Sequence, residues 1–325
     1  MTTIREVARI AGVSSATVSR VMNGSASVGS RTKAKVLKAL DETGYKPNEL
    51  ARALYKRSSK IIEIIVPNID NPFFSEMENA IEEEAYLRGY RILLCSSNND
   101  FEKERVNIHM LSGMKANGII LMTNNEKTGN AVAGTDIPVV VVDRHVTTGG
   151  EVAYIESDNY QGGVIAAEHL IDCGCKNIVC MRGPQGFTSG MQRYHGYLSV
   201  CRRYGIKERV IDTRYDFQSG LAAAKELVKK YPEIDGAFAA NDLVAFSAFK
   251  ILSSEGRAVP DDVQIVGFDN IKFDTLMTPE FTTIAQPIEK MGQMAVSIID
   301  KLSKGEKFAR DNVFDVKLIK RQTTR

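Results

Sequence analysis

Two spacings of apolar residues divide the chain into a short first part and a longer second part. In the first 45 residues, apolar side chains recur every three or four positions, as they do on one face of a helix. Three segments carry this spacing: residues 4–11, 15–22 and 31–43. Gly12, which can adopt a positive φ, separates the first two. We therefore expect three short helices with no strand between them.

The first two expected helices have the spacing of a helix-turn-helix. This motif needs a small residue where the helices cross, a glycine in the turn and two apolar residues that seat the second helix. Ser14 or Ser15 can cap the second helix, and Val36, Leu37 and Leu40 would face inward from the third. Four residues have the required properties at the required offsets: Ala8, Gly12, Val18 and Val21.

From residue 61 onward, short apolar runs alternate with amphipathic helical stretches, which is typical of α/β proteins. Several runs are apolar at consecutive positions, as expected of parallel strands buried on both faces. The long connection around residues 143–176 separates the runs into two groups. We therefore expect a body of two parallel-sheet subdomains with a cleft between them, rather than one large sheet. The expected strands are residues 61–66, 91–95, 118–122, 139–142, 177–181, 210–212, 236–240, 264–268 and 282–285.

Composition narrows the class of protein. The chain has 325 residues, 43% of them hydrophobic, which is enough for more than one core. No apolar run approaches the roughly 18 residues that a membrane helix needs, and the N-terminus carries no apolar signal core. The five cysteines are odd in number and suit a reducing compartment. We expect a cytoplasmic protein without a membrane partner.

The charge is distributed unevenly along the chain. Residues 1–60 contain twelve Lys and Arg against four Asp and Glu, a net charge of +8, whereas the remaining 265 residues carry −6. A basic head on an acidic body indicates that the head alone meets a polyanion. Nucleic acid is the leading candidate, and a solvated basic face is the alternative.

The second expected helix would lie in the major groove with its N-terminal residues toward the base edges. Arg20 can pair two donors with guanine, and Ala16 can meet a thymine methyl group. The alternative for each outward residue is a solvent-facing or capping role. The residues expected to read bases are Ser15, Ala16, Thr17 and Arg20, and those expected to hold phosphates are Ser19, Asn23, Ser30 and Thr32.

Residues 48–57 are expected to form one short helix after the head. Pro47 ends helical geometry, and Asn48 is a good N-cap for a new helix. A helix of about ten residues with so few apolar side chains is marginal in water. We therefore expect a hinge segment that folds only when another surface holds it.

Polar and aromatic residues follow the expected strands of the body. In open parallel sheets, ligands sit beyond the carboxyl ends of the strands. Aromatic faces can pack on the CH groups of a sugar ring while charged and amide side chains bind its hydroxyls, whereas a phosphate would need more positive charge. The strand-end residues that suit such a ligand are Asn71, Phe73, Phe74, Asp143, Arg144, Arg193, Asn241, Asp269 and Gln286.

The head and hinge resemble the lactose-repressor/galactose-repressor family of bacterial regulators. The resemblance rests on Thr3-Ile4-Arg5-Glu6-Val7-Ala8, Gly12-Val13-Ser14, residues 16–23 and the pattern Tyr45-x-Pro-Asn-x-x-Ala-Arg-x-Leu54. It implies that Thr3 belongs to the DNA-binding face. It also implies that paired hinge helices push Leu54 into the minor groove of the operator. The implied domains are a DNA-binding head at 1–47, a hinge at 48–60 and a sensing and dimerisation body at 61–325.

The body resembles the periplasmic sugar-binding-protein fold that the same family uses. Its finer pattern is most similar to ribose-binding members and ribose-operon repressors. The resemblance implies that the strand-end residues above bind ribose, and it adds Phe217 to the set. No cofactor is implied.

Other classes fit the sequence less well. The four histidines stand far apart, and residues 182–186 lack the lysine and serine of a phosphate loop, so we expect neither an enzyme nor a metal site. A transport protein would lack the basic head. Two regulator types stay open: a member that a purine activates as co-repressor, and a global carbon regulator with a phosphocarrier protein as partner.

A single head makes too few contacts for specificity, so we expect a homodimer on a near-palindromic operator. With a ribose-like cleft, the sugar is expected to act as an inducer that separates the two hinges and releases the repressor from DNA. The opposite effect, in which the ligand brings the hinges together and acts as a co-repressor, stays open.

Overall fold

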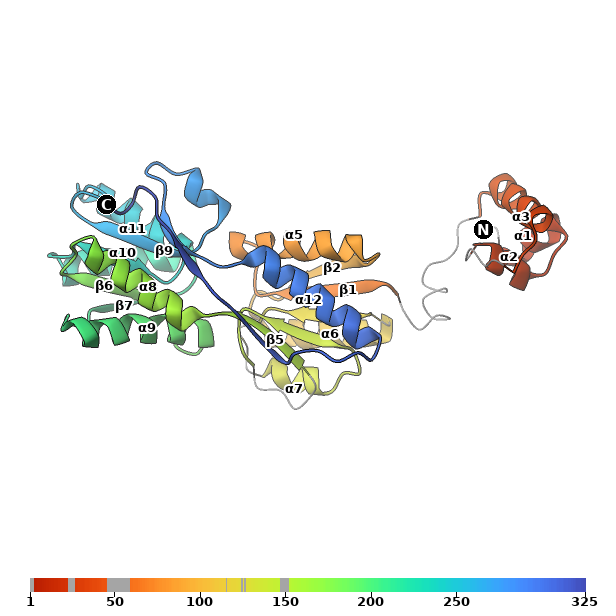
Figure 1. Ribbon diagram of the computed structural model, residues 1–325, viewed down its shortest axis with the longest axis horizontal. Coiled ribbons are helices and arrows are strands. Elements are labelled where there is room, and N and C mark those ends of the chain that lie inside the picture. Colours follow the sequence, from red (N-terminus) through yellow and green to blue (C-terminus); the bar gives the residue numbers. More distant parts are fainter. Residues whose placement is uncertain are drawn as a thin grey trace. The chain divides into compact units, whose positions relative to one another are not determined.

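The computed structural model describes residues 3–22, 27–45, 59–114, 116–123, 125, 127–146 and 152–325, without the side chains of residues 111 and 112 (Figure 1). They belong to two compact units, Met1–Ser59 and Lys60–Arg325, which we describe separately. The expected hinge helix with Leu54, and Asn23, lie outside the described residues.

The described part of the first unit contains the helices α1 (Ile4–Ala11), α2 (Ser15–Met22) and α3 (Ser30–Thr43). Gly12 ends α1 with a φ of 67°, as expected. Ser14 is the residue that caps α2, because its Oγ accepts from the Thr17 amide at 3.1 Å. The expectation for Leu37 was wrong: its side chain is exposed, and Ala39 is buried against α1 and α2 in its place. Only a narrow stripe of α3 is buried, and the small side chain of Ala39 fits there against α1 and α2 better than that of Leu37.

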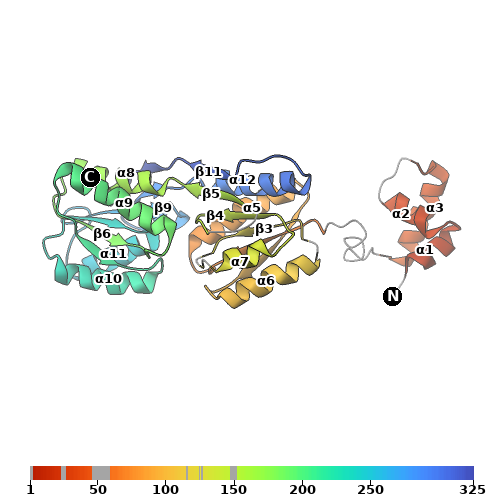
Figure 2. The ribbon, with the colours of Figure 1, turned by 90° about the horizontal axis from the view of Figure 1, so that it is seen from below.

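The body begins with a sheet whose six strands are all parallel, in the order β11-β5-β4-β3-β1-β2. Its strands are β1 (Ile61–Val66), β2 (Arg91–Ser96), β3 (Gly118–Leu121), β4 (Val139–Val142), β5 (Val152–Ser157) and β11 (Asp311–Phe314). The helices α5 (Pro72–Leu87) and α12 (Ile288–Ser303) cover one face, and α6 (Phe101–Met114) and α7 (Thr128–Ala133) cover the other (Figure 2).

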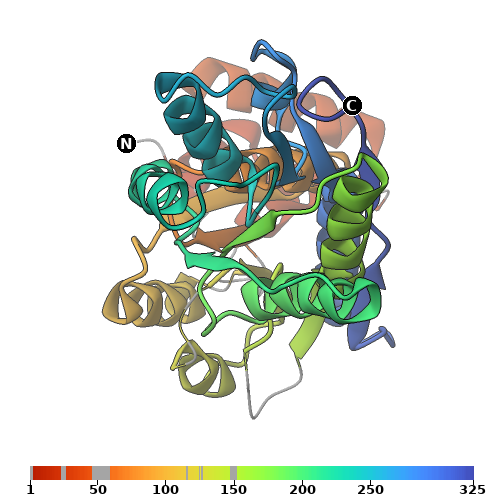
Figure 3. The ribbon, with the colours of Figure 1, turned by 90° about the vertical axis from the view of Figure 1, so that its left-hand side faces the viewer.

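A second six-stranded sheet has the order β12-β10-β9-β8-β6-β7, in which β12 alone runs antiparallel to its neighbour. Its strands are β6 (Ile178–Arg182), β7 (Val210–Asp212), β8 (Gly236–Ala239), β9 (Gln264–Asp269), β10 (Thr282–Ala285) and β12 (Lys317–Ile319). The helices α8 (Asn159–Asp172) and α9 (Thr188–Tyr204) lie on one side of it, and α10 (Phe217–Lys230) and α11 (Asp242–Ser254) lie on the other (Figure 3).

The chain crosses between the two subdomains three times, after β5, after β10 and between β11 and β12. All nine expected strands are present with ends that agree within one residue, but β5, β11 and β12 were not expected. The segment 143–176 therefore holds a strand and a helix. The division into two consecutive groups was also incomplete, because α12 and β11 return to the first subdomain.

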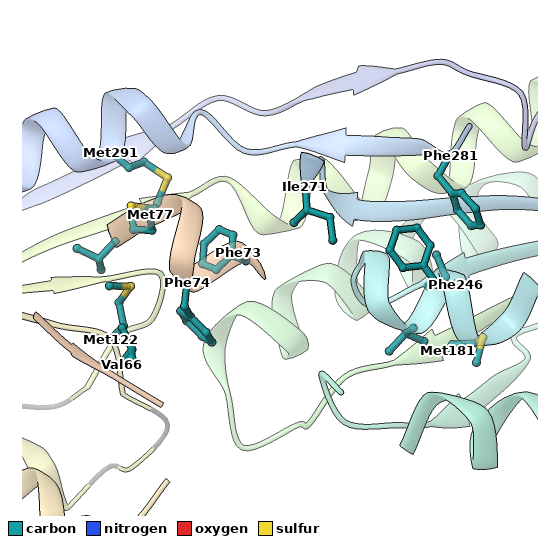
Figure 4. Close-up of a cluster of buried hydrophobic side chains, with 14 of the residues drawn as sticks. Val66, Phe73, Phe74, Met77, Met122, Met181, Phe246, Ile271, Phe281 and Met291 are labelled. Atoms are coloured by element: carbon teal, nitrogen blue, oxygen red, sulfur yellow. The ribbon is translucent and has the colours of Figure 1, made fainter. Parts of the chain in front are cut away.

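One apolar cluster continues from the first subdomain into the second. Figure 4 shows Met77 and Met291 in the first, Phe246 and Phe281 in the second, and Phe73 between them. Phe73 is 3% exposed, so this part of the interface is packed like a core.

Candidate functional site

The strand-end residues meet in one cavity between the subdomains. Eight of the ten expected ligand residues line it: Asn71, Phe73, Phe74, Asp143, Arg144, Arg193, Asn241 and Asp269. Ser189 and Tyr215 complete the lining and were not expected. The cavity volume is about 10 Å³, far below the roughly 300 Å³ or more of ordinary ligand pockets. A ligand therefore requires the two subdomains to move apart before they close around it.

Helix starts and strand ends fix several of these side chains. Asn71 and Asn241 cap α5 and α11, each accepting a backbone amide through its Oδ1 at 3.1 Å. Asp143 directly follows β4 and has a φ of 74°, and Asp269 is the last residue of β9 and has a φ of 113°. Few residues other than glycine adopt such positive φ angles. Strained backbone at both aspartates is a feature that folded proteins tolerate mainly at functional sites.

Arg193, on α9, is the best-satisfied cation of the cavity. Its Nε donates to Oδ1 of Asn159 at 2.8 Å, and its Nη1 donates to the carbonyl oxygen of Ala240 at 2.7 Å. Its Nη2 lies 3.5 Å from Oδ1 of Asp269, and its guanidinium lies 3.6 Å from the ring centre of Phe268. These contacts fix the direction in which the remaining donors point.

Two side chains hold one oxygen of Asp269. Gln286 donates from Nε2 to its Oδ1 at 2.7 Å, and Arg193 Nη2 lies 3.5 Å from the same oxygen. Burial raises the pKa of Asp269 well above its usual range, and Arg193 opposes that shift. The carboxyl group is thus positioned to donate or accept a hydrogen bond inside the cavity.

Arg144, from the first subdomain, reaches across the cleft. Its guanidinium carbon lies 4.5 Å from the ring centre of Phe187 and 5.3 Å from that of Tyr215, both in the second subdomain. Its Nε lies 3.2 Å from Oδ2 of Asp143, but the angle is unsuitable for a hydrogen bond. Nη1 is buried and has no hydrogen-bond partner among the described residues.

Two hydroxyl groups of the cavity are also buried without a hydrogen-bond partner among the described residues, Ser189 Oγ and Tyr215 Oη. Buried polar groups are nearly always paired in folded proteins. Three unpaired polar groups in one small cavity, beside the apposed rings of Phe73 and Phe74, therefore suit a ligand with several hydroxyls and an apolar face.

Two expected residues do not line the cavity. Gln286 acts on it only through Asp269. Phe217 begins α10, and its side chain packs on the apolar core, so this expectation is corrected to Tyr215, two residues earlier. Asp216 is the N-cap of α10, so Tyr215 lies in the loop between the end of β7 and that helix. The rule that ligands bind beyond the carboxyl ends of strands would therefore have selected Tyr215.

A wider groove adjoins the cavity. It has a volume of about 510 Å³ and shares Asn71, Phe74, Arg144 and Tyr215 with the inner cavity. Phe187 lines the outer groove only. The cleft therefore has an inner polar chamber and an outer vestibule, and the shared residues form the wall between them.

The described residues offer little support for a metal site or a reactive cysteine. There, no group of three or more His, Cys, Asp or Glu could hold a metal ion. Burial raises the pKa of Cys95 and Cys175 to about 12, so neither thiol is an activated nucleophile. Nor is any helix in these ranges long and apolar enough to cross a membrane.

On the head, the structure places the expected DNA-contacting residues as follows. Ala16, Arg20 and Ser30 are exposed, and Ser15, Thr17, Ser19 and Thr32 are half-buried. The Thr17 hydroxyl lies 2.9 Å from that of Ser14. Thr3 caps α1 by accepting the Glu6 amide at 3.4 Å. Arg20 is thus the exposed cation of α2, on its last turn.

Comparison with known proteins agrees with this architecture. Residues 3–48 match the model of the bacterial regulatory proteins of the lacI family, and residues 62–307 match a periplasmic binding protein domain. The ribose operon repressor of Halalkalibacterium halodurans is 36% identical over 100% of this chain and 98% of its own length. The ribose operon repressor of Bacillus subtilis is 34% identical over 100% of this chain and 99% of its own length.

Three solved structures extend the comparison. A periplasmic binding protein/LacI regulator of Alkaliphilus metalliredigens in complex with D-xylulofuranose is 35% identical, with a TM-score of 0.74 over 82% of this chain and 99% of that one. A LacI family regulator of Enterococcus faecium with bound ribose is 27% identical, with a TM-score of 0.74 over 81% and 98%. The Lac repressor dimer bound to operator is 26% identical, with a TM-score of 0.89 over 99% and 98%.

Proposed function

The chain belongs to the lacI family of bacterial regulatory proteins, and on this basis we propose that ribose, or a closely related pentose, binds in its inner cavity and controls its binding to an operator. The protein is a sugar-responsive transcriptional repressor. The observation that carries the choice of ligand is the set of three unpaired buried groups beside Phe73 and Phe74.

The chemistry of the inner cavity supports a sugar as its ligand. Arg144, Ser189 and Tyr215 offer free hydrogen-bonding groups, while Asp143 and Asp269 offer carboxyl oxygens. Carboxyl and guanidinium groups line several sides of the cavity, which suits the hydroxyls of a sugar better than the flat faces of a nucleobase. The two similar structures that hold a pentose, D-xylulofuranose in one and ribose in the other, are consistent with this choice.

Calorimetric titration with D-ribose, D-xylulose, D-glucose, hypoxanthine and ribose 5-phosphate tests the ligand. Binding of a pentose, with no response to hypoxanthine, supports the proposal. Binding of hypoxanthine with no response to any sugar contradicts it and favours a purine co-repressor. We do not propose a phosphocarrier partner, because no contact in the described residues selects one.

We place the DNA-binding surface on α2 and the start of α3, with Arg20 as the base-reading residue. Thr3, Ser15, Ala16, Thr17, Ser19, Asn23, Ser30, Thr32 and Leu54 complete the proposed set. Since the DNA partner is chromosomal, we place the protein in the bacterial cytoplasm. We retain 1–47, 48–60 and 61–325 as head, hinge and body.

We also propose a homodimer on a near-palindromic operator. An exposed apolar stripe supports it: Val106, Met110 and Met114 recur at four-residue spacing on α6, and Leu94 is exposed on the edge strand β2. An exposed patch of this kind beside an unpaired strand edge needs a covering partner. Met110→Lys should shift sedimentation toward the monomer, whereas Arg105→Ala, on an exposed face of the same helix away from this stripe, should not.

The sugar should act as an inducer. Closure of the cleft around it would move the two hinges of a dimer apart, the hinge helices would unfold, and Leu54 would leave the minor groove. Operator affinity, measured with and without saturating ribose in the native protein and in Leu54→Ala, tests this. Affinity that rises with ribose would reverse the mechanism, and normal bending by Leu54→Ala would remove the hinge from it.

A further inference from the structure

Phe187 occupies the point where the inner cavity meets the outer groove. It is the N-cap residue of α9, and its ring lies parallel to that of Tyr215 within 14°, with 6.3 Å between the ring centres. Tyr215 is in turn packed against Gly183 and Gly190, where a Cβ would come within 2.9 and 3.0 Å of its ring or hydroxyl. The pair therefore forms a fixed aromatic surface on the second subdomain.

Arg144 lies on this surface from the opposite side of the cleft. Its guanidinium carbon is 4.5 Å from the ring centre of Phe187 and 5.3 Å from that of Tyr215, both within the range of a cation–π contact. The neighbouring His145 amide donates to Thr188 Oγ1 at 3.2 Å, which ties the same loop to the start of α9. Arg144 is 6% exposed, so solvent screens this contact little.

Arg144 is also part of the wall between the two spaces, because it lines both the inner cavity and the outer groove. Phe187 lines only the groove, so it supports the wall from outside. If the ring were absent, Arg144 would lose the nearer of its two aromatic partners. The inner cavity would then open toward about 510 Å³ of groove.

We infer that Phe187 is a specificity-determining residue, which holds Arg144 across the cleft and thereby limits the ligand to one sugar ring. This inference rests on the proposed sugar function and deepens it. Phe187 is a positioning residue, since it acts through Arg144 rather than by touching the sugar.

The test compares the affinities for D-ribose and cellobiose, measured by calorimetry on the full chain. In Phe187→Leu, the ratio of ribose affinity to cellobiose affinity should fall about tenfold, because a cation–π contact contributes roughly three- to thirtyfold in affinity. Phe187→Tyr keeps the aromatic face and should restore the ratio. Tyr194→Leu, which removes the aromatic partner of Arg182 away from the cavity, is the matched control and should leave the ratio unchanged.

An unchanged ratio in a folded Phe187→Leu protein overturns the inference while the proposed function stands. Failure of the native protein to bind any pentose overturns both. If Phe187→Leu does not fold, Phe187→Met and a double-mutant cycle with Arg144→Met decide the question. Their effects on ribose affinity should be less than additive, and additive effects would contradict the inference.

Discussion

Gly163 packs directly against the backbone of Arg193: a Cβ built on Gly163 would lie 2.1 Å from the Arg193 carbonyl oxygen. Gly196 repeats the relationship from α9, where a Cβ would lie 2.2 Å from the carbonyl oxygen of Tyr160. Two helices that lack Cβ atoms at both contact points can approach closely. The close contact between α8 and α9 thus sets the position of Arg193 in the cavity.

Gly163→Ala should therefore weaken both folding and sugar binding. The added methyl group meets backbone atoms, which cannot move aside as a flexible side chain can, so the two helices must separate. We expect a loss of about 1 to 3 kcal/mol in the free energy of unfolding and a weaker affinity for ribose. Urea unfolding and calorimetry measure the two effects.

The matched control is Gly113→Ala on α6, where a Cβ meets nothing within 4 Å. It should not destabilise the protein and should stabilise it by up to about 1 kcal/mol, because alanine favours helical geometry over glycine. If Gly163→Ala were equally harmless, the tight crossing of α8 and α9 would not position Arg193.

Arg144→Ala should reduce ribose affinity by roughly 1.5 to 3 kcal/mol, the range for hydrogen bonds to charged groups. Its buried Nη1 is free to bind a ligand hydroxyl, and the substitution also removes the cation–π contact with Phe187. Asp269→Ala should have an effect of the same size. Arg182→Ala, at the end of β6, is the control and should bind ribose normally.

The candidate site could largely be predicted because strand ends can be read locally. Asn71, Asp143, Asn241 and Asp269 each follow an apolar run, and chain topology then brings such positions together. Phe217 was added from the family resemblance, whereas the aromatic residue that lines the cavity is Tyr215, on the other side of the Asp216 cap that begins α10. The difference of two residues moved the aromatic side chain from the cavity to the core.

The rest of the fold depended on contacts between distant segments. β11 is a four-residue strand with two polar residues, and it pairs with β5 more than 150 positions earlier in the chain. The sequence 311–314 carries no alternation that would separate it from a loop. Likewise, α12 has an amphipathic pattern, but nothing in that pattern tells to which of two similar subdomains it returns.

Arg20→Ala should strongly reduce the preference of the protein for operator over random DNA. Arg20 is the exposed cation of α2, and a bidentate pair with guanine contributes about 1 to 3 kcal/mol of discrimination. Fluorescence anisotropy with operator and scrambled duplexes measures the ratio of affinities. A ratio equal to that of the native protein would show that Arg20 does not read bases.

Lys33→Ala should weaken binding to both duplexes equally. Lys33 is exposed on the first turn of α3, and we expect it to neutralise a phosphate rather than to read a base. Loss of one phosphate contact lowers the slope of log affinity against log salt by about 0.9. A change in sequence preference without a change in slope would contradict this role.

Glu63→Gln should stabilise the protein at pH 8 and leave it unchanged at pH 4. Glu63 lies in β1, fully buried, and neither carboxylate oxygen has a hydrogen-bond partner among the described residues. Burial raises the pKa of Glu63 from 4.5 to about 7, and only the adjacent Cys95 thiol opposes the shift. Because the folded state holds this proton more tightly than the unfolded chain, stability is greatest below pH 4.5. It falls as the pH rises to about 7, and the loss reaches about 3 kcal/mol.

The control for this substitution is another buried acid of the same subdomain. Glu104, on α6, is also fully buried, but its carboxylate accepts hydroxyl groups from Ser97 at 3.1 Å and Thr123 at 2.8 Å, and from Thr128. Glu104→Gln removes these charge-assisted bonds and should destabilise the protein at pH 8, opposite in sign to Glu63→Gln. Urea unfolding of both variants between pH 4 and pH 8 distinguishes the two environments. If Glu63→Gln were destabilising at pH 8, the carboxylate of Glu63 would have to be stabilised in the fold, and the pH dependence derived from its burial would be wrong.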